Sequence, residues 1–151
     1  MRRFLAALVV VVTAASAVMA DDKPLDGDLK KLQGKWTTKA GPEAAPVFLT
    51  FDKGKIAFQV IAPTGDQKII AGEVTIDEKA APKSMNWSNM KLGRNDVPGT
   101  QAIYVLDGED TLKIAGGGKD RPTEFIEKGK ALPGLRPNTM IFTRVKDAPK
   151  K

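Results

Sequence analysis

The sequence predicts an all-β domain, an antiparallel up-and-down barrel of eight or nine strands that follows a short N-terminal helical turn. Strand signals recur at roughly ten-residue spacing, with turn residues between them, which is typical of a sandwich or a barrel. No segment has the pattern of an amphipathic helix long enough to cover a parallel sheet. A closed barrel of about eight strands leaves no exposed edge, and its interior holds side chains or one small ligand.

The first half of the domain is expected to begin with a helix and to continue as strands. Residues 28–33 (DLKKLQ) predict one or two helical turns, with Asp26 or Asp28 near the N-cap. Gly34 ends these turns, and Trp36 opens the β region. Strands are then expected at 47–51, 55–61, 68–77 and 83–92, followed by a loop at 94–99.

The first two of these strands alternate apolar and polar residues. One face of each strand carries the apolar side chains, which are Val47, Leu49 and Phe51, then Ile56, Phe58 and Val60. This period of two predicts a half-buried sheet. Asp52-Lys53-Gly54 between the strands is typical of a compact hairpin turn. In the next strand the alternation is imperfect, and Gly72 indicates a bulge.

The second half of the domain is centred on a hairpin. Its strands are expected at 101–106 and 111–115, and they meet at the tight turn Asp107-Gly108-Glu109-Asp110. A glycine loop follows, and then a short strand is expected at 123–127. The last strand, 139–145, comes after a loop rich in Gly and Pro.

The N-terminus has the parts of a secretory signal peptide. Met1-Arg2-Arg3 is a positive n-region, and residues 4–12 (FLAALVVVV) form an apolar run. That run is too short for a stable membrane anchor, which needs ~20 residues. Val18-Met19-Ala20 presents a cleavage site, and Ala15-Ser16-Ala17 presents a second one. We therefore expect an exported protein, periplasmic or extracellular, that has no membrane association after cleavage.

The chain thus divides into four parts. Residues 1–20 are the signal peptide, 21–27 a flexible mature N-terminus, 28–146 the barrel domain and 147–151 a polar tail. Loss of the two signal-peptide arginines takes Lys+Arg from 24 to 22 against 18 acidic residues, so the net charge falls from +6 to +4. The lysines are scattered among acidic residues without a basic helix, so nucleic acid is not an expected partner.

Two residue types that carry much enzyme chemistry are missing. The chain has no cysteine and no histidine. It therefore lacks a disulfide, a thiol nucleophile, a Ser-His-Asp triad, an imidazole base and a soft-metal site. Only carboxylates, lysines and Tyr104 remain as candidate acids or bases, and they form no paired motif. We expect a protein that is not an enzyme, and no cofactor is implied.

The two ends of the domain carry a matching pair of motifs. Gly34-Lys35-Trp36 lies where the helical turns meet the first strand, and Arg144 closes the last strand. Lipocalins and their relatives carry a Gly-x-Trp on the first strand and an arginine on the last, stacked on that indole, and the order and spacing here resemble theirs. We hypothesise that Arg144 covers Trp36 in a cation–π contact worth ~1–2 kcal/mol. The roles of Gly34, Trp36 and Arg144 would then be structural.

A second set of motifs runs along the whole domain. It consists of Leu32-Gln33-Gly34-Lys35-Trp36, the hairpin from Leu49-Thr50-Phe51 to Ile56, Ile76-Asp77 with Pro82-Lys83-Ser84-Met85, residues 103–114, residues 121–125, and Phe142-Thr143-Arg144. In combination these motifs resemble a lipocalin-like domain family of unknown function, a calycin-like β-barrel found mainly in planctomycete bacteria. The resemblance covers about residues 28–146, which is nearly the whole mature chain. It implies the fold and, as in many members, export, but it implies no activity and no catalytic residue.

The segment Arg121-Pro122-Thr123-Glu124-Phe125 could serve binding or structure. Arg121 is a bidentate donor and Glu124 an acceptor, three residues apart around a proline turn. If Arg121 faces the barrel mouth, it can hold a ligand carboxylate or phosphate. In the alternative, Arg121 pairs locally with a carboxylate or with carbonyl groups, and Phe125 packs inward. Glu124 and Phe125 would then be structural.

Acidic residues crowd two turns, at Asp77-Glu78 and at Asp107, Glu109 and Asp110. Oxygen clusters can bind calcium, but the spacing is not that of an EF-hand, and hairpin tips use Asp for turn geometry. No metal site is expected. Gly116-Gly117-Gly118-Lys119 lacks both the spacing and the following helix of a phosphate loop.

Two interpretations of the function stay open. In the first, the barrel holds a small, mostly apolar molecule. The candidate lining is Phe58, Val60, Met85, Trp87, Tyr104, Met140 and Phe142, with Arg121 as a polar contact. In the second, the barrel is packed solid and acts through its loops as an interaction or inhibitor module, as the aromatic content of only 6% allows. An apolar void of ~300–1,000 Å³ would favour the first.

Overall fold

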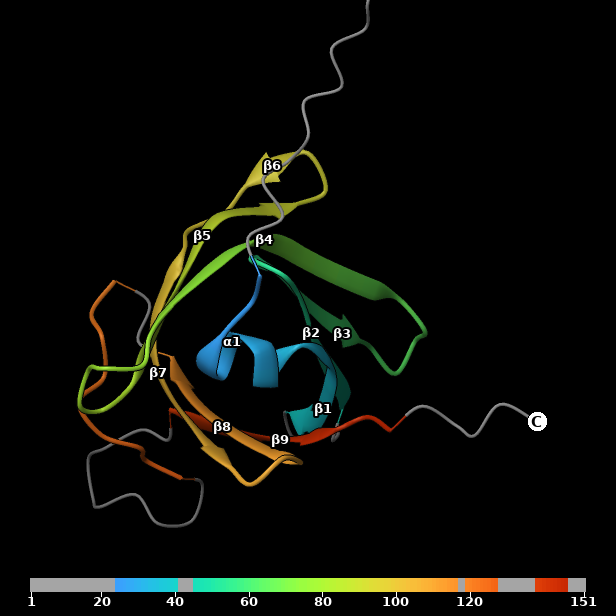
Figure 1. The fold of residues 1–151 in the computed structure, drawn as a ribbon. Helices are drawn as coiled ribbons and strands as arrows, with labels where there is room; N and C mark the ends of the chain where they lie inside the picture. Colours follow the sequence, from blue (N-terminus) through green and yellow to red (C-terminus); the bar gives the residue numbers. More distant parts are fainter. Residues whose placement is uncertain (1–23, 41–44, 117–118, 128–137, 147–151) are drawn as a thin grey trace, which may run out of the picture.

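The strands form one continuous antiparallel sheet that closes on itself, as a computed structural model of the chain shows (Figure 1). The structure describes residues 24–40, 45–116, 119–127 and 138–146. In chain order the elements are α1 (Gly27–Leu32), β1 (Gly34–Ala40), β2 (Ala45–Asp52), β3 (Lys55–Ile61), β4 (Gln67–Asp77), β5 (Ser84–Leu92), β6 (Asn95–Asp96), β7 (Thr100–Asp107), β8 (Thr111–Gly116) and β9 (Thr139–Arg144).

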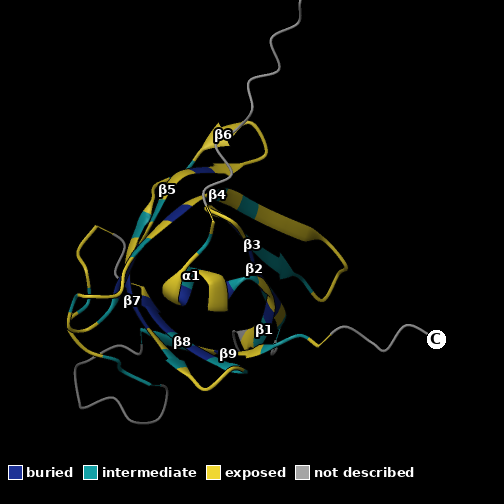
Figure 2. Cartoon of the chain, in the orientation of Figure 1, coloured by how far each residue is buried: buried dark blue, intermediate teal, exposed yellow. Residues whose placement is uncertain are grey.

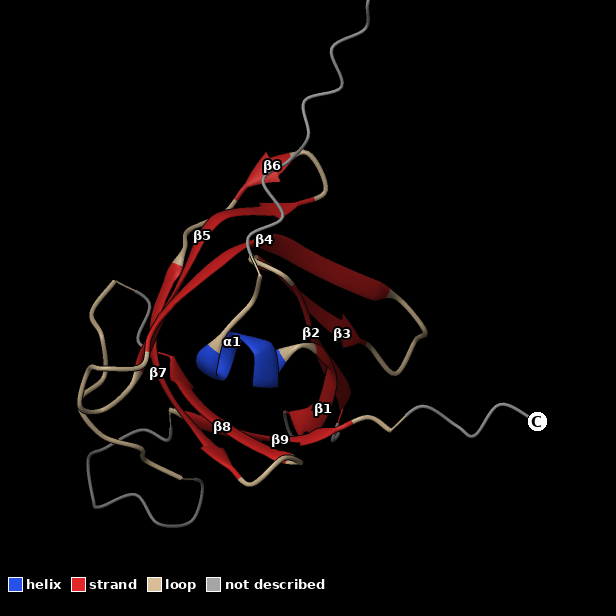
Figure 3. Ribbon diagram, viewed as in Figure 1, coloured by secondary structure: helices blue, strands red, loops and turns tan. Residues whose placement is uncertain are grey.

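Eight of the strands make the barrel. Their order is β4-β3-β2-β1-β9-β8-β7-β5, and β4 also pairs with β5, which closes the ring. The short β6 adds a ninth strand to the outer end of β5 (Figure 3). Apart from β6, strands that follow one another in sequence are neighbours, and the first and last strands meet where Trp36 pairs with Arg144. The predicted up-and-down antiparallel barrel with a short N-terminal helix is therefore confirmed.

The helix α1 lies within the ring of strands when the barrel is viewed along its length (Figure 1). Leu32 of the helix is fully buried, and Leu29 packs against the same core. The indole N–H of Trp36 donates to the Leu32 carbonyl at 2.8 Å. The segment after the helix also contacts the β2–β3 turn, because the Lys53 amide donates to Gln33 Oε1 at 2.6 Å. The helix therefore closes one end of the barrel.

Buried and exposed residues alternate along much of the barrel wall, and the buried ones form the core (Figure 2). The period-two faces expected for the first hairpin are confirmed: Val47, Leu49, Phe51 and Ile56 are buried, and Phe58 and Val60 are partly buried against them. The Gly72 bulge is also confirmed, since the β4–β5 register shifts between Ala71 and Glu73. A side chain at Gly72 would meet the Ser88 carbonyl oxygen at 2.5 Å, so glycine lets the two strands approach there.

One stretch of the outer wall is covered as well. Ile103 and Ala115 pair across β7 and β8, on the opposite face from the core residues beside them, yet both are fully buried. Residues 119–127 run outside these strands and are linked to the barrel through Asn138. The Ile126 amide donates to Asn138 Oδ1 at 2.9 Å, and the Asn138 amide donates to the Ile126 carbonyl at 3.0 Å.

Two expectations about this region were wrong. Residues 123–127 form no strand, because β8 already pairs with β7 and β9 and offers no free edge. In the expected loop at 94–99, Asn95 and Asp96 form β6, since the tight turn at Gly93, with a φ of 64°, brings them back against β5. Residues 1–20 and 147–151, and most of the loop before the last strand, lie outside the described residues.

Candidate ligand-binding site

A cavity of about 400 Å³ opens at the end of the barrel opposite α1. Five apolar side chains line it: Phe58, Trp87, Ile114, Met140 and Phe142. They come from β3, β5, β8 and β9. Because β3 and β9 are separated in the ring by two other strands, side chains from both can meet only across the barrel interior. The cavity is therefore part of the lumen and not a groove in the outer surface.

The polar part of the cavity wall is small and consists of uncharged residues. Thr100, Asn138 and Thr139 line it at the ends of β7 and β9, together with Gly116. The Thr139 hydroxyl donates to Asn138 Oδ1 at 2.9 Å. The aromatic rings of Phe58 and Trp87 are tilted by 40° to each other, with 6.3 Å between their centroids. An apolar wall with a few polar groups at its rim suits a small, mostly apolar ligand.

Half of the residues expected to bind a ligand meet in this cavity. Phe58, Trp87, Met140 and Phe142 line it. Val60 is only partly buried and packs against the core from the same face of β3, but it is not part of the lining. Met85 and Tyr104 point inward too, but both are fully buried nearer to α1. Strand periodicity predicts that a residue faces inward, but it does not predict which end of the barrel the helix fills.

Several lining residues were missed by the sequence interpretation. Ile114 follows Leu112 on the inward face of β8, so the alternation of apolar residues in this strand could have predicted that Ile114 faces the lumen. Thr100, Asn138 and Thr139 carry no such signal, because they are polar residues at strand ends. Asn138 also anchors the outer segment, since its side-chain N–H donates to the Glu124 carbonyl at 3.3 Å.

Arg121 lies on the outer side of the wall. Its guanidinium donates to Oδ1 of Asn86, which points outward from β5 between the inward-facing Met85 and Trp87. It therefore neither pairs with a carboxylate nor enters the lumen among the described contacts. Phe125 is half buried in the same segment, whereas the Glu124 side chain is exposed.

A groove of about 490 Å³ runs beside Arg121. Its lining comes from β5, from the start of β7 and from the outer segment: Asn86, Trp87, Gly99, Thr100, Gln101, Lys119 and Arg121. Trp87 and Thr100 belong to the lining of both this groove and the apolar cavity. The two hollows therefore share one stretch of wall.

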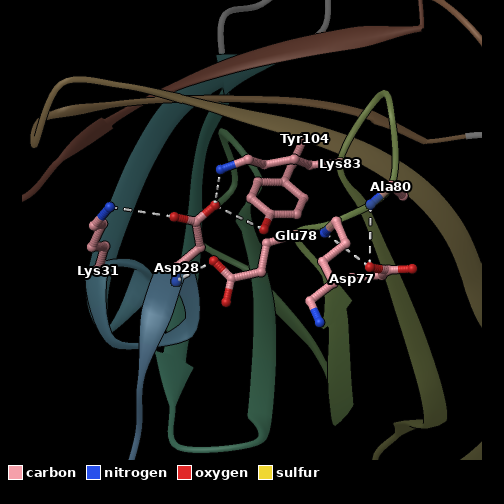
Figure 4. A network of polar contacts seen from close by, with 8 residues as sticks. Asp28, Lys31, Asp77, Glu78, Ala80, Lys83 and Tyr104 are labelled. Carbon is pink, nitrogen blue, oxygen red and sulfur yellow. Dashed lines mark hydrogen bonds and ion pairs between the residues drawn. The ribbon is translucent and has the colours of Figure 1, made fainter.

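The opposite end of the barrel carries a buried polar network around Asp28 of α1 (Figure 4). Asp28 is only 3% exposed and accepts hydrogen bonds from Lys83 Nζ at 2.5 Å, from the Tyr104 hydroxyl at 3.1 Å and from Lys31 Nζ at 3.5 Å. The Asp28 amide donates to Glu78 Oε2 at 3.0 Å. These contacts tie the helix to β7 and to the β4–β5 connection.

The network shifts the pKa values of two of its members. Burial alone raises the pKa of Asp28, but the hydrogen bonds from Lys83 and Tyr104, the positive charge of Lys83 and the Lys31 contact outweigh it, so the net pKa is below 3.8. Burial, followed by the negative charge of Asp28, raises the pKa of the Tyr104 hydroxyl. Tyr104 is therefore a protonated donor that helps to hold the helix, and not a base facing the cavity.

The stacking of Arg144 on Trp36 is confirmed, with the guanidinium carbon 4.1 Å from the centre of the indole ring. Arg144 also donates to the Lys31 carbonyl at 2.6 Å, to the Gln33 carbonyl at 2.8 Å and to the Glu109 carbonyl at 2.7 Å. It thus joins the end of α1 to the β7–β8 turn. Gly34 has a φ of 105° there, which favours glycine.

A third hollow, of about 610 Å³, lies at this closed end. Its lining consists of polar or charged residues and a glycine: Lys30, Lys31, Gln33, Gly108, Glu109, Asp110 and Arg144. The Arg144 donors are already used by three carbonyl groups, and Asp110 pairs with Lys146 at 2.8 Å. Although this hollow is larger, the charged groups of Arg144 and Asp110 in its lining already have partners within the protein. The apolar cavity is the better candidate for a ligand, because its wall consists mainly of apolar side chains.

The fold and the site together define a small antiparallel β-barrel that is closed by a helix at one end and hollow at the other. Within the described parts of the chain, no three acidic side chains gather where they could hold a metal ion, and no helix is long and apolar enough to cross a membrane. Comparisons with models of protein families, with curated proteins and with solved structures found no match for this chain.

Proposed function

We propose that this protein is a small-molecule carrier that binds an apolar ligand in the cavity at the open end of the barrel. The observation that supports the proposal most is the cavity of about 400 Å³ with Phe58, Trp87, Ile114, Met140 and Phe142 in its wall. That volume falls within the ~300–1,000 Å³ typical of ligand sites. The proposal includes no catalytic residue and no cofactor.

One end of the barrel is filled by side chains, and the other end contains the cavity. Trp36, Leu32 and the Asp28 network fill the end that α1 closes. A ligand would therefore enter and leave only from the other end, past Thr100, Asn138 and Thr139. Burial of its apolar surface against the cavity wall would supply the affinity, at about 25 cal/mol for each Å² removed from water.

Family membership and export are parts of the same proposal. The Gly34-Lys35-Trp36 motif with the stacked Arg144, and the hairpin of β7 and β8, support membership of the lipocalin-like family. The sequence of residues 1–20 supports export to the periplasm or the outside of the cell. Cleavage at the first site would leave Asp21 as the N-terminal residue of the mature protein, which mass measurement of the secreted protein would test.

The second candidate function is a packed barrel that acts through its loops as an interaction or inhibitor module. The apolar cavity favours the carrier over this alternative, because a solid interior would leave no such space. The two proposals differ in one measurable property: only the carrier binds small apolar molecules in a saturable way.

Filling the cavity tests the proposal. Met140 points into the cavity, and its neighbour Ile141 is 42% exposed on the outer face of the same strand. We expect Met140→Trp to weaken binding of the uncharged dye 1-aminoanthracene about tenfold or more, equivalent to ~1.4 kcal/mol. Ile141→Trp adds the same side chain to the outside and should leave the affinity unchanged. Fluorescence titration measures both.

The fold of each variant is checked by circular dichroism and thermal melting. If Met140→Trp does not fold, Ile114→Phe occupies the cavity with a smaller increase in volume. A wild-type protein that binds no apolar dye, or equal binding by the wild type and a folded Met140→Trp, would contradict the carrier function and leave the packed-barrel alternative.

A further inference from the structure

We propose that the natural ligand is an amphiphile whose apolar chain occupies the cavity and whose anionic oxygen head group is held by Arg121 and Lys119 in the adjoining groove. This inference rests on the proposed function, and it adds the chemical class of the ligand. A carboxylate and a phosphate share the chemistry required, because both present several negatively charged oxygen acceptors to guanidinium and ammonium donors.

The first support is the shared wall between the two hollows. Trp87 is the last residue of β5 that pairs with β7, opposite Thr100. Beyond this pair β5 no longer pairs with β7, but it continues to Leu92 beside β4 and there pairs with β6, which folds back onto it. Trp87 and Thr100 therefore lie where the pairing of β5 with β7 ends, and both residues line the apolar cavity as well as the groove. A ligand that fills the cavity can reach the groove over this rim.

The second support is the separation of charge. No charged side chain is among the described residues that line the cavity. The groove lining carries two positive charges, Lys119 and Arg121, and no negative one, since Asp120 does not belong to it. Apolar surface and positive charge are thus arranged side by side, which matches a molecule with an apolar chain and an anionic head.

The third support is the state of the two cations. The Arg121 guanidinium uses a donor on Asn86, which fixes it against the outer wall of β5 and leaves other N–H donors of its five. Lys119 is exposed, and among the described residues no carboxylate pairs with it. Both groups can therefore approach an oxyanion without first breaking an ion pair.

Matched ligands test this inference. Dodecanoate, dodecyl phosphate and dodecanol share one apolar chain and differ in the head group, and each can displace 1-aminoanthracene at low salt. We expect the wild type to bind both anions about tenfold more tightly than the alcohol, since hydrogen bonds to charged groups are the stronger ones. This preference should shrink in high salt because the groove is exposed.

Substitutions in the groove test whether its two cations cause the preference for anions over dodecanol. Arg121→Gln and the double variant Arg121→Gln/Lys119→Gln should lose most of the preference for the anions and keep the wild-type affinity for dodecanol. Lys55→Gln removes the same charge from an exposed position at the start of β3, by the closed end, and should change nothing. Loss with one anion only would identify that head group and support the inference.

Two results would overturn it. Equal affinity of the wild type for dodecanol and both anions would show that no charged head group is recognised. An anion preference that persists in the double variant would place recognition elsewhere. Failure of all three compounds to bind would instead contradict the proposed carrier function itself, so the two failures are distinguishable.

Discussion

At the scale of single residues, Arg144 has more contacts than its motif suggests. The sequence interpretation expected the stacking on Trp36, and the structure confirms it at 4.1 Å. The three carbonyl groups that Arg144 also binds could not be predicted, because two belong to the end of α1 and the third to the β7–β8 turn. Only the folded chain brings these backbone segments together.

The planar guanidinium of Arg144 should therefore matter beyond its charge. We expect Arg144→Lys to lower the free energy of unfolding by ~1–3 kcal/mol, because an ammonium group cannot serve three carbonyls and stack on an indole. Denaturant unfolding would measure this. The matched control is Lys146→Gln, which removes an exposed pair with Asp110 and should leave the free energy of unfolding close to that of the wild type. Wild-type stability of Arg144→Lys would show that the stacking and the carbonyl contacts are incidental.

At the scale of elements, the helix α1 closes the barrel through both apolar and polar contacts. Leu32 could be assigned to the core from its spacing with Leu29, and the structure buries it fully. Asp28 could not, since an acidic residue in a first helical turn is ordinarily a solvated cap residue. Its burial depends on Lys83 and Tyr104, which lie more than fifty residues away in the chain. Sequence periodicity holds no information about such a partnership.

The contribution of Asp28 to the stability of the fold should depend on pH. The pKa of Asp28 in the folded protein lies below its ordinary value of 3.8, so the ionised group stabilises the fold above that pH. This contribution is lost as the pH falls below 3.8 and through the folded value. Asp28→Asn should lower stability by ~1–3 kcal/mol at neutral pH, and the difference from the wild type should shrink in acid.

Thermal melting between neutral pH and strong acid checks this dependence. Asp96→Asn is the control, because it also replaces a carboxylate by an amide, but at an exposed position where Asp96 pairs with Lys91 at 3.6 Å. A constant difference between Asp28→Asn and the wild type at every pH would mean that ionised Asp28 does not stabilise the folded state.

At the scale of the whole molecule, the barrel followed from the sequence, but its division into a filled and a hollow end did not. The sequence interpretation placed Phe58 and Phe142 in the candidate lining, and both line the cavity. It placed Tyr104 in the same lining, but Tyr104 lies at the filled end, beside Asp28. Position along the barrel axis depends on where α1 sits. The position of Arg121 on the outer wall could not be predicted either. It depends on the closure of the sheet, in which β8 pairs with both β7 and β9, so that the segment after β8 cannot join the sheet and runs outside it.

An apolar molecule is expected to bind in the open-end cavity, and the two tryptophans of the chain test this binding directly. Trp87 lines the cavity, whereas Trp36 is fully buried at the closed end. A bromoalkane quenches an indole only on contact, so its titration against the wild type and Trp87→Phe reports where it binds. We expect saturable quenching in the wild type and none in Trp87→Phe, while that variant still binds 1-aminoanthracene. Equal quenching of both proteins, or no saturable quenching of the wild type, would contradict this expectation.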